Sequence, residues 1–263
     1  MQPREILLYL SMKHSGDWNA IYNSVVAKEE CDDNEVAKSI KECESKFITI
    51  LDDEYPESLR QVTKPPFVLF YHGDISLISD KNNKIAVVGS RDNTQYGEDV
   101  TNKFVSYLAK DFVIISGLAR GIDGIAHRCA INAGGKTVAV IGQGINVCYL
   151  EQNEDIYEEC KKNHLVISEY PNSVSPSPWN FPIRNRIIAG LCDTLLITEG
   201  KINSGTQITA LLMVEKDGNV CCVPTRAGED SICNHLISDG AYLVETPEDI
   251  YDITHIVSKR TIF

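Results

Sequence analysis

The sequence predicts an α/β protein built on an extended, Rossmann-like, doubly wound and mostly parallel sheet, with a small helical segment at the N-terminus. Three observations predict this class. From residue 84 onward, apolar runs of four to six residues rich in Val and Ile alternate with helix-length segments. The runs are apolar throughout, as in strands covered on both faces. Glycine, hydroxyl or basic residues follow most of the runs, and the carboxyl ends of such strands are where ligands bind.

The predicted organisation has three parts: a helical segment over residues 1–46, the Rossmann-like domain over 47–255, and a tail over 256–263. Pro3 suits a first helical turn, and Leu7 and Leu10 share a face of that helix. Apolar residues near 20–26 and 36–40 predict two more short helices. Residues 47–80 contain proline turns and one predicted strand, Val68–Tyr71.

The domain itself shows a regular alternation of strands and helices. The expected strands are Ile85–Val88, Phe112–Ile115, Thr137–Ile141, Leu165–Ile167, Thr194–Ile197 and Val220–Val223. The expected helices between them are Glu98–Lys110, Ile122–Asn132, Asp155–Lys162 and Gln207–Lys216. This order predicts βαβ units and a parallel sheet.

Composition narrows the function classes. The net charge of −12 argues against broad, non-specific binding to nucleic acid, although it leaves room for a local basic pocket. Nine cysteines without a C-x-x-C pair indicate reduced thiols rather than a disulfide framework. No apolar run approaches the roughly 18 residues that span a bilayer, and no signal peptide is evident, so we expect a cytoplasmic protein without membrane attachment.

The loops at the strand ends predict anion binding. They are Gly89–Arg91, Ser116–Asp123, Gly142–Ile145 and Glu199–Thr206. Glycine permits close approach of the backbone to a phosphate, and helix N-termini supply amide donors. The candidate residues are Gly89, Gly117, Gly142, Gly144 and Gly205 for backbone approach, Ser90, Ser204 and Thr206 as hydroxyl donors, and Arg91 and Arg120 as cations. No G-x-G-x-x-G or Walker loop is present, so neither an ordinary dinucleotide site nor nucleotide hydrolysis is supported.

The segment FPIRNRIIAG at 181–190 adds two arginines and an amide, Arg184, Asn185 and Arg186. If Arg186 begins the helix that runs to Leu191, these side chains lie beside the same edge of the sheet. They would then contact phosphates and base edges, while Phe181 or Trp179 offers a stacking face. The alternative is that the arginines pair with surface carboxylates.

Asp123 and His127 stand at i and i+4 on one predicted helix, a spacing compatible with a metal. Because no third ligand is evident, we expect no metal or other cofactor; Asp123 should support the helix start while His127 bonds locally.

With these loops assembled, the chain resembles the DNA-processing protein family DprA, also called Smf. The matching text includes AVVGSRDNTQYG (86–97), SGLARGIDGIAH (116–127), GGKTVAVIGQGINVCY (134–149), ISEYP (167–171), FPIRNRIIAGL (181–191), SGTQITALLMVE (204–215) and NHLISDGAYLV (234–244). The resemblance implies no enzyme. It implies a dimer that binds single-stranded DNA, protects incoming strands and loads the RecA recombinase during natural transformation. Its DNA pocket would include Gly89, Ser90, Arg91, Arg184, Asn185, Arg186, Ser204 and Gly205, and its C-terminal third would mediate dimerisation.

Departures from the family pattern are Glu151, where a lysine is common, Asn219 and Ile232. Their effect on DNA affinity stays open. Two alternatives also stay open: a nucleoside-monophosphate phosphoribohydrolase-like enzyme with Glu199 as general base, and a dimeric protein-interaction adaptor whose DNA pocket has drifted.

Overall fold

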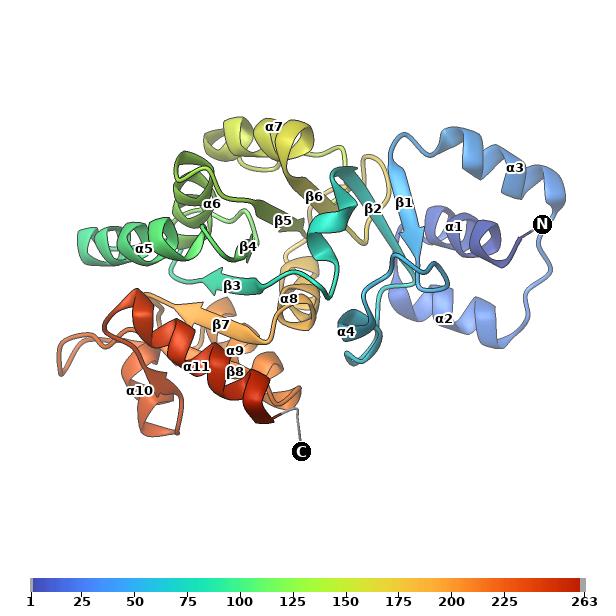
Figure 1. Ribbon diagram of the computed structural model, residues 1–263. Coiled ribbons are helices and arrows are strands. Elements are labelled where there is room, and N and C mark those ends of the chain that lie inside the picture. The colour runs from blue at the N-terminus through green and yellow to red at the C-terminus, as the bar shows by residue number, and fades with distance from the viewer. Residues whose placement is uncertain (1, 261–263) are drawn as a thin grey trace.

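A computed structural model describes residues 2–260 of the chain, with side chains described up to residue 254. Within this part, nine strands form one sheet in the order β1-β2-β6-β5-β4-β3-β7-β8-β9 (Figure 1). The parallel strands are β3 (Lys84–Val88), β4 (Val113–Ser116), β5 (Thr137–Ile141), β6 (Leu165–Ser168), β7 (Thr194–Ile197), β8 (Asn219–Cys222) and β9 (Tyr242–Leu243). The predicted doubly wound, mostly parallel sheet is confirmed.

Two antiparallel strands extend the sheet toward the N-terminal segment. They are β1 (Lys46–Thr49) and β2 (Val68–Gly73), and β2 also pairs with β6. Only β2 was expected from the sequence. Strand β9 has only two residues, too few to show a hydrophobic period. Strand β1 begins with the exposed Lys46 and is buried only at its last two residues, so it lacks the continuous apolar run of the central strands.

Helices cover both faces of the sheet. One face packs against α4 (Glu57–Arg60), α8 (Asn180–Leu191), α9 (Gly205–Glu215) and α10 (Ile232–Ser238). The other packs against α5 (Gln95–Leu108), α6 (Ile122–Asn132), α7 (Glu154–Asn163) and α11 (Pro247–Arg260). Alternate residues of β3 serve the two layers: Ala86 and Val88 face α8, while Ile85 and Val87 face α5 and α6. Such a fully buried strand explains the continuous apolar run.

Two boundaries differ from expectation. Helix α8 begins at Asn180, so the predicted start at Arg186 is wrong; Pro182 lies in its first turn, where proline is tolerated. Helix α11 reaches Arg260 and thus includes residues 256–260 of the predicted tail, whose last three residues lie outside the described part of the chain.

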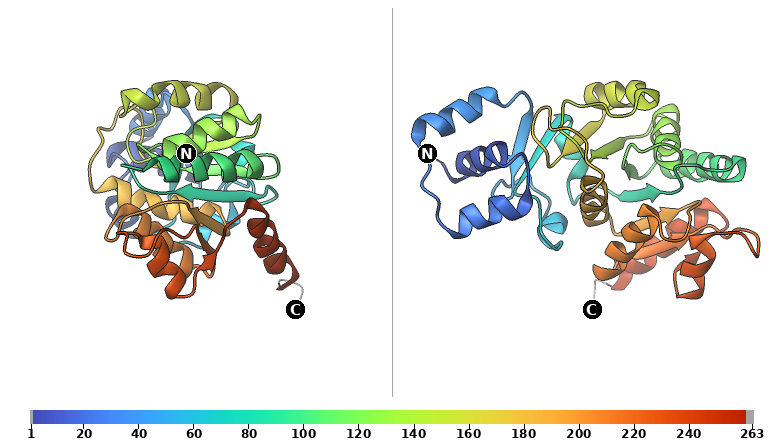
Figure 2. Two further views of the ribbon diagram at one scale, coloured as in Figure 1. Left: turned by 90° about the vertical axis from the view of Figure 1, so that its left-hand side faces the viewer. Right: turned by 180° about the vertical axis from the view of Figure 1, so that it is seen from behind.

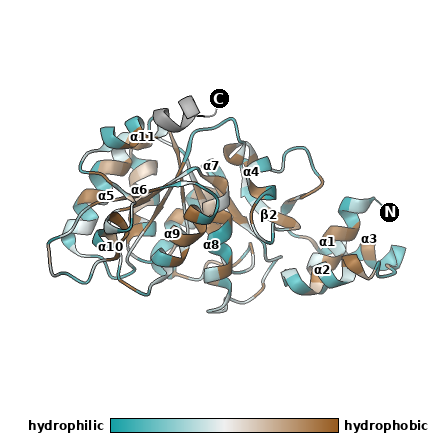
Figure 3. Cartoon of the chain, turned by 90° about the horizontal axis from the view of Figure 1, so that it is seen from below, coloured by the Kyte–Doolittle hydropathy of each residue, from teal (hydrophilic) through white to brown (hydrophobic). Residues whose placement is uncertain are grey.

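The N-terminal helices are α1 (Pro3–Lys13), α2 (Trp18–Val26) and α3 (Asp33–Glu42), as the sequence predicts. Asp17 and Asp32 cap α2 and α3 through their carboxylates. The three helices enclose a small core of their own, with Leu10 and Ile21 at its centre, and they carry both apolar and polar faces (Figure 3). They lie at one end of the molecule, opposite the C-terminal third (Figure 2).

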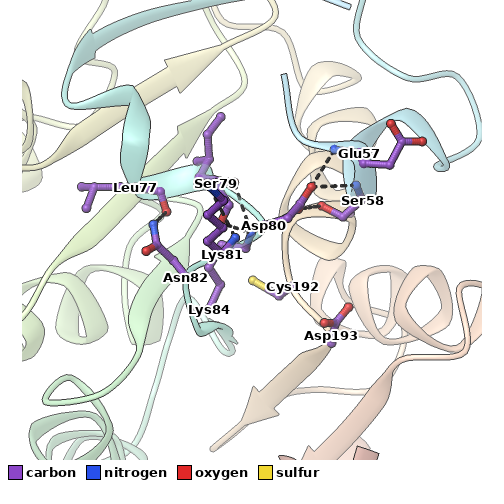
Figure 4. Close-up of polar contacts among 12 residues, drawn as sticks. Glu57, Ser58, Leu77, Ser79, Asp80, Lys81, Asn82, Lys84, Cys192 and Asp193 are labelled. Carbon is purple, nitrogen blue, oxygen red and sulfur yellow. Dashed lines mark hydrogen bonds and ion pairs between the residues drawn. The ribbon is translucent and has the colours of Figure 1, made fainter. Parts of the chain in front are cut away.

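At the amino end of β3, one carboxylate organises the connection from β2. Asp80 accepts hydrogen bonds from the Glu57 amide at 2.7 Å and the Ser58 hydroxyl at 2.6 Å, which caps α4 (Figure 4). The Lys84 ammonium lies 3.4 Å from Asp80 and donates to the Ser79 carbonyl at 2.7 Å. This network holds β3 in place from the end opposite the ligand side. No described helix is long and apolar enough to cross a membrane.

Candidate functional site

A cavity of about 540 Å³, here called the cleft, opens at the carboxyl ends of β3 and β7. These strands are neighbours in the sheet, but the chain leaves β3 toward β4 on the other side. The cleft therefore occupies the topological switch point, where doubly wound sheets bind their ligands. Eight of the predicted site residues line it: Gly89, Ser90, Arg91, Arg184, Asn185, Ser204, Gly205 and Thr206.

The loop after β3 is packed closely against the loop after β7. A Cβ on Gly89 would lie 2.5 Å from the Glu199 carbonyl oxygen, so only glycine fits. The Ser90 amide donates to that same carbonyl at 2.8 Å. The Glu199 carboxylate accepts from both the amide and the hydroxyl of Thr94 at the start of α5. Glu199 is thus occupied as a helix cap and does not line the cleft, which argues against the alternative in which it acts as a general base.

The opposite wall is the start of α9. Ser204 precedes this helix, and its hydroxyl donates to the Lys201 carbonyl at 2.6 Å. The Asn185 amide on α8 donates to the Gly205 carbonyl at 3.2 Å. This contact holds the first turn of α9 against α8. The Gln207 amide already donates to the Ser204 carbonyl at 3.1 Å, so the amides of this turn without a helical partner are those of Gly205 and Thr206. An N-terminus in a cleft is a favourable place for a phosphate.

Arg184 is the buried cation of the cleft, with 4% of its surface exposed. Its Nη1 donates to the carbonyls of Gly117, at 2.7 Å, and Val140. Its Nε has no hydrogen-bond partner among the described residues. Burial lowers the pKa of Arg184 to about 10, while nearby Asp123 opposes the shift, so the guanidinium stays charged at neutral pH. A buried cation with an unused donor is a ready partner for an anion.

Arg186 lies on the other side of α8. Its Nη2 donates to both carboxylate oxygens of Glu169 at 2.7 and 2.8 Å, and its Nε donates to the Lys64 carbonyl at 2.8 Å. Both partners of this ion pair are buried. Because residues two apart on a helix point in nearly opposite directions, Arg184 and Arg186 cannot share one ligand. The structure does not bring Arg186 to the cleft, and its carboxylate partner is in the interior rather than at the surface.

A smaller cavity of about 300 Å³, here called the side pocket, adjoins the cleft beyond β4 and β5. Gly117 and Arg120 line this side pocket rather than the cleft. The Arg120 guanidinium is paired with Asp92 and donates to the Arg91 carbonyl at 3.1 Å.

Gly142 and Gly144 line neither cavity. A Cβ on Gly144 would lie 2.3 Å from the Val174 amide nitrogen, and one on Gly142 would lie 3.0 Å from the Phe181 ring. Close packing of the loop after β5 against segment 172–181 therefore explains both glycines without a ligand.

Aromatic side chains line the opening of the cleft. The Arg91 guanidinium lies 5.7 Å from the centre of the Phe181 ring, and the Tyr149 ring lies 5.8 Å from that of Phe181. Trp179, two residues before Phe181 in the chain, is 81% exposed and lines neither cavity. The sequence reasoning did not name Tyr149 or Lys201 as site residues, although both line the cleft. The sequence signal that could have identified these two residues is their position in the loops after β5 and β7.

Asp123 and His127 have local partners. The Asp123 carboxylate accepts from the Gly117 amide at 3.2 Å and the Ala119 amide at 3.4 Å, and so supports the loop before α6. His127 Nδ1 lies 2.7 Å from the Thr137 hydroxyl. Burial lowers the pKa of His127 to about 3, which keeps the ring neutral. Among the described residues, no group of three or more His, Cys, Asp or Glu side chains is placed to hold a metal.

Comparison with known proteins finds relatives over most of the chain. The model of the family described as DNA recombination-mediator protein A matches residues 46–255. The DNA processing protein DprA of Streptococcus pneumoniae is 40% identical over 223 residues, which cover 84% of this chain and 78% of that protein.

Two solved structures share the fold. The X-ray structure of DprA from Streptococcus pneumoniae has a TM-score of 0.79 and 37% identity, and the match covers 89% of this chain and 81% of that one. A DprA structure from Helicobacter pylori, described as giving insight into a single-stranded DNA binding mode, has a TM-score of 0.73 and 27% identity. That match covers 82% of this chain and 98% of the other.

Proposed function

This chain belongs to the DNA recombination-mediator protein A family, and from that premise we propose that it binds single-stranded DNA in the cleft and acts in DNA processing during natural transformation. The observation that carries the proposal is the buried Arg184. Its side chain lines a cleft whose other walls are the glycine loop after β3 and the N-terminus of α9, and its buried Nε has no hydrogen-bond partner among the described residues. The relative from Helicobacter pylori is described as binding single-stranded DNA.

In this proposal the phosphodiester backbone supplies the anion. Arg184 and the exposed Arg91 neutralise phosphates, and the first-turn amides of α9 donate to their oxygens. The aromatic rings at the opening stack on bases regardless of sequence, which a duplex would not allow. The net charge of −12 then confines binding to this basic site and suppresses attraction elsewhere on the surface.

The test is fluorescence anisotropy of a labelled oligo(dT) at several salt concentrations, with duplex DNA and nucleoside monophosphates as competitors. Arg91→Ala and Arg184→Ala should each weaken binding and reduce the slope of log K against log salt by about 0.7, the value for one lost phosphate contact on a single strand. Lys38→Ala removes an exposed charge from α3 and should leave the slope unchanged. Unchanged slopes in both arginine variants, or displacement by a monophosphate, would refute the proposal and favour a small-nucleotide enzyme.

Within this function we propose a more specific role: the chain is a cytoplasmic mediator that loads the RecA recombinase and forms a dimer through its C-terminal third. An apolar stripe on α9 supports self-association: Ile208, Leu211 and Val214 are 39%, 54% and 57% exposed. Leu211→Glu should convert a dimer to a monomer in sedimentation velocity. A parent chain that sediments as a monomer at micromolar concentration would refute the dimer. RecA loading is tested separately by strand exchange on strands coated with single-strand-binding protein.

A further inference from the structure

A further cavity lies in the N-terminal helical segment, at the end of the molecule opposite the C-terminal third (Figure 2). Its volume is about 460 Å³, and it is here called the N-terminal groove. It shares no lining residue with the cleft or the side pocket. Strand binding in the cleft therefore gives no reason for its presence.

The floor of the N-terminal groove is one face of α1. The lining residues from this helix are Pro3, Ile6, Leu7 and Leu10. Their spacing of i, i+3, i+4 and i+7 is that of a continuous stripe, about 10 Å long at 1.5 Å per residue. Residues of α2 line the groove beside this stripe. Such a surface suits a further helix, because the side-chain ridges of one helix fit the grooves of another.

Two other lining residues are apolar and remain open to solvent. Val25 on α2 is 41% exposed, and Leu51, two residues after β1, is 56% exposed. Val26, next to Val25 in the chain, is 61% exposed. Isolated exposed apolar residues are common, but a group of them around a hollow with a charged rim is typical of a protein interaction site.

The charges at the rim of the groove indicate the chemistry of the partner. Two ion pairs are neutralised within the chain: Lys13 with Glu29 at 2.5 Å, and Arg4 with Asp52 at 3.3 Å. Three exposed acidic residues next to these pairs in the chain have no ion-pair partner in the described part of the protein: Glu30, Asp53 and Glu54. Among the described lining residues, Lys28 is the exposed cation. The rim is therefore negative and favours a partner with lysine or arginine beside its apolar residues.

We propose that the N-terminal groove binds an amphipathic helix of a partner protein, with apolar residues at i, i+3, i+4 and i+7 and basic residues on its flanks. The apolar residues pack on the α1 stripe, and the cations meet the acidic rim. Binding of a helix in an apolar groove is a recurrent mode of peptide recognition. A second copy of this chain suits the groove less, because a symmetric contact would bring two acidic rims together. The inference goes beyond the proposed function and does not depend on it.

The test is fluorescence anisotropy with a labelled synthetic peptide of about four helical turns, in which leucines occupy one face and lysines the remaining positions. A comparison peptide of the same composition distributes its leucines around the helix, so that the two peptides carry the same charge. The parent should bind the first peptide roughly tenfold more tightly than the second.

Leu51→Glu should weaken binding of the first peptide by roughly tenfold. Because this substitution adds a negative charge, non-specific attraction of a cationic peptide would become stronger, so the sign of the change separates the two explanations. Ile40→Glu makes the same kind of change on α3 at a residue that is 39% exposed and does not line the groove. This matched control should bind the peptide at least as tightly as the parent.

The acidic rim is tested by replacing Asp53 with Asn and Glu54 with Gln together. This variant should weaken peptide binding by roughly threefold to tenfold, and the effect should shrink at high salt. Unchanged affinity at low salt would overturn the choice of a basic partner.

The remaining outcomes are also decisive. Equal affinity of the parent for both peptides, or unchanged or tighter binding by folded Leu51→Glu, overturns the proposal. If Leu51→Glu does not fold, Val25→Glu takes its place, with the same expected and refuting results. Dissociation of an oligomeric parent by Leu51→Glu in sedimentation velocity would show that a second copy occupies the groove, and it also overturns the proposal. Oligo(dT) binding is measured in parallel and should be unchanged in Leu51→Glu, so failure here leaves the proposed function standing.

Discussion

Replacing Arg186 by methionine separates a structural arginine from a ligand-binding one. The substitution keeps an unbranched side chain inside α8 but leaves the Glu169 carboxylate buried without its partner. Breaking a buried ion pair in this way costs about 3–5 kcal/mol. An unfolding entropy of about 2.1 cal/mol/K per residue gives roughly 0.55 kcal/mol/K for 263 residues. We therefore expect the melting temperature to fall by roughly 5–9 °C.

The assay is a thermal melt at pH 7, followed by strand binding at a temperature where the variant is folded. The double variant Glu169→Gln with Arg186→Met should recover most of the lost stability, because no unpaired charge is left in the interior. The salt slope of oligo(dT) binding should equal that of the parent. A melting temperature within 1 °C of the parent, together with a slope reduced by about 0.7, would show that Arg186 binds phosphate and that the ion-pair reasoning is wrong.

The same variant has a defined pH dependence. Burial raises the pKa of Glu169 above its ordinary value of 4.5, and removing Arg186 removes the main influence that lowers it. Above pH 4.5 the folded variant then binds a proton that the unfolded chain does not. Its stability should fall as the pH rises from 4.5 through the raised folded pKa. The stability difference from the parent should be smaller at pH 5 than at pH 8, and a constant difference would contradict the assignment.

Three further predictions follow from the geometry. In Gly117→Ala the new Cβ would lie 2.4 Å from Arg184 Nη1 and displace the guanidinium. Oligo(dT) binding should weaken roughly tenfold, the loss expected for about one charge-assisted hydrogen bond. Affinity equal to that of the parent would show that binding tolerates displacement of Arg184. His127 is held neutral, with a pKa of about 3 against an ordinary 6.5, so stability is lost as the pH falls from 6.5 toward 3. In denaturant titrations His127→Gln should lose less over that window, and an equal loss refutes this. Glu151→Lys places a cation next to the side-pocket residues Leu150 and Gln152. The slope of log K against log salt for oligo(dT) binding should steepen by about 0.7. An unchanged slope would mean that the bound strand does not pass residue 151.

The sequence by itself determined the class of fold and the edge of the sheet that carries the site. Continuous apolar runs such as Thr137–Ile141 are fully buried strands, and the carboxyl ends of parallel strands meet at one edge. For that reason the sequence alone places the loops at Gly89 and Ser204 at the same edge of the sheet. The short strands β1 and β9 and helix α11 could not be predicted in this way. Their positions depend on pairing and packing with distant segments, such as that of β9 with β8.

Only the tertiary structure decided which arginine faces the cleft. Every residue of α8 from Arg184 to Leu191 is buried, so the helix has no polar face from which its orientation could be inferred. The rotation of α8 about its own axis is set instead by packing against the sheet on one side and by the contacts of Arg186 with Glu169 and the Lys64 carbonyl on the other. The same holds for Glu199. Its carboxylate caps α5 through Thr94, which lies about 100 residues away in the chain, and local sequence spacing does not encode such a contact.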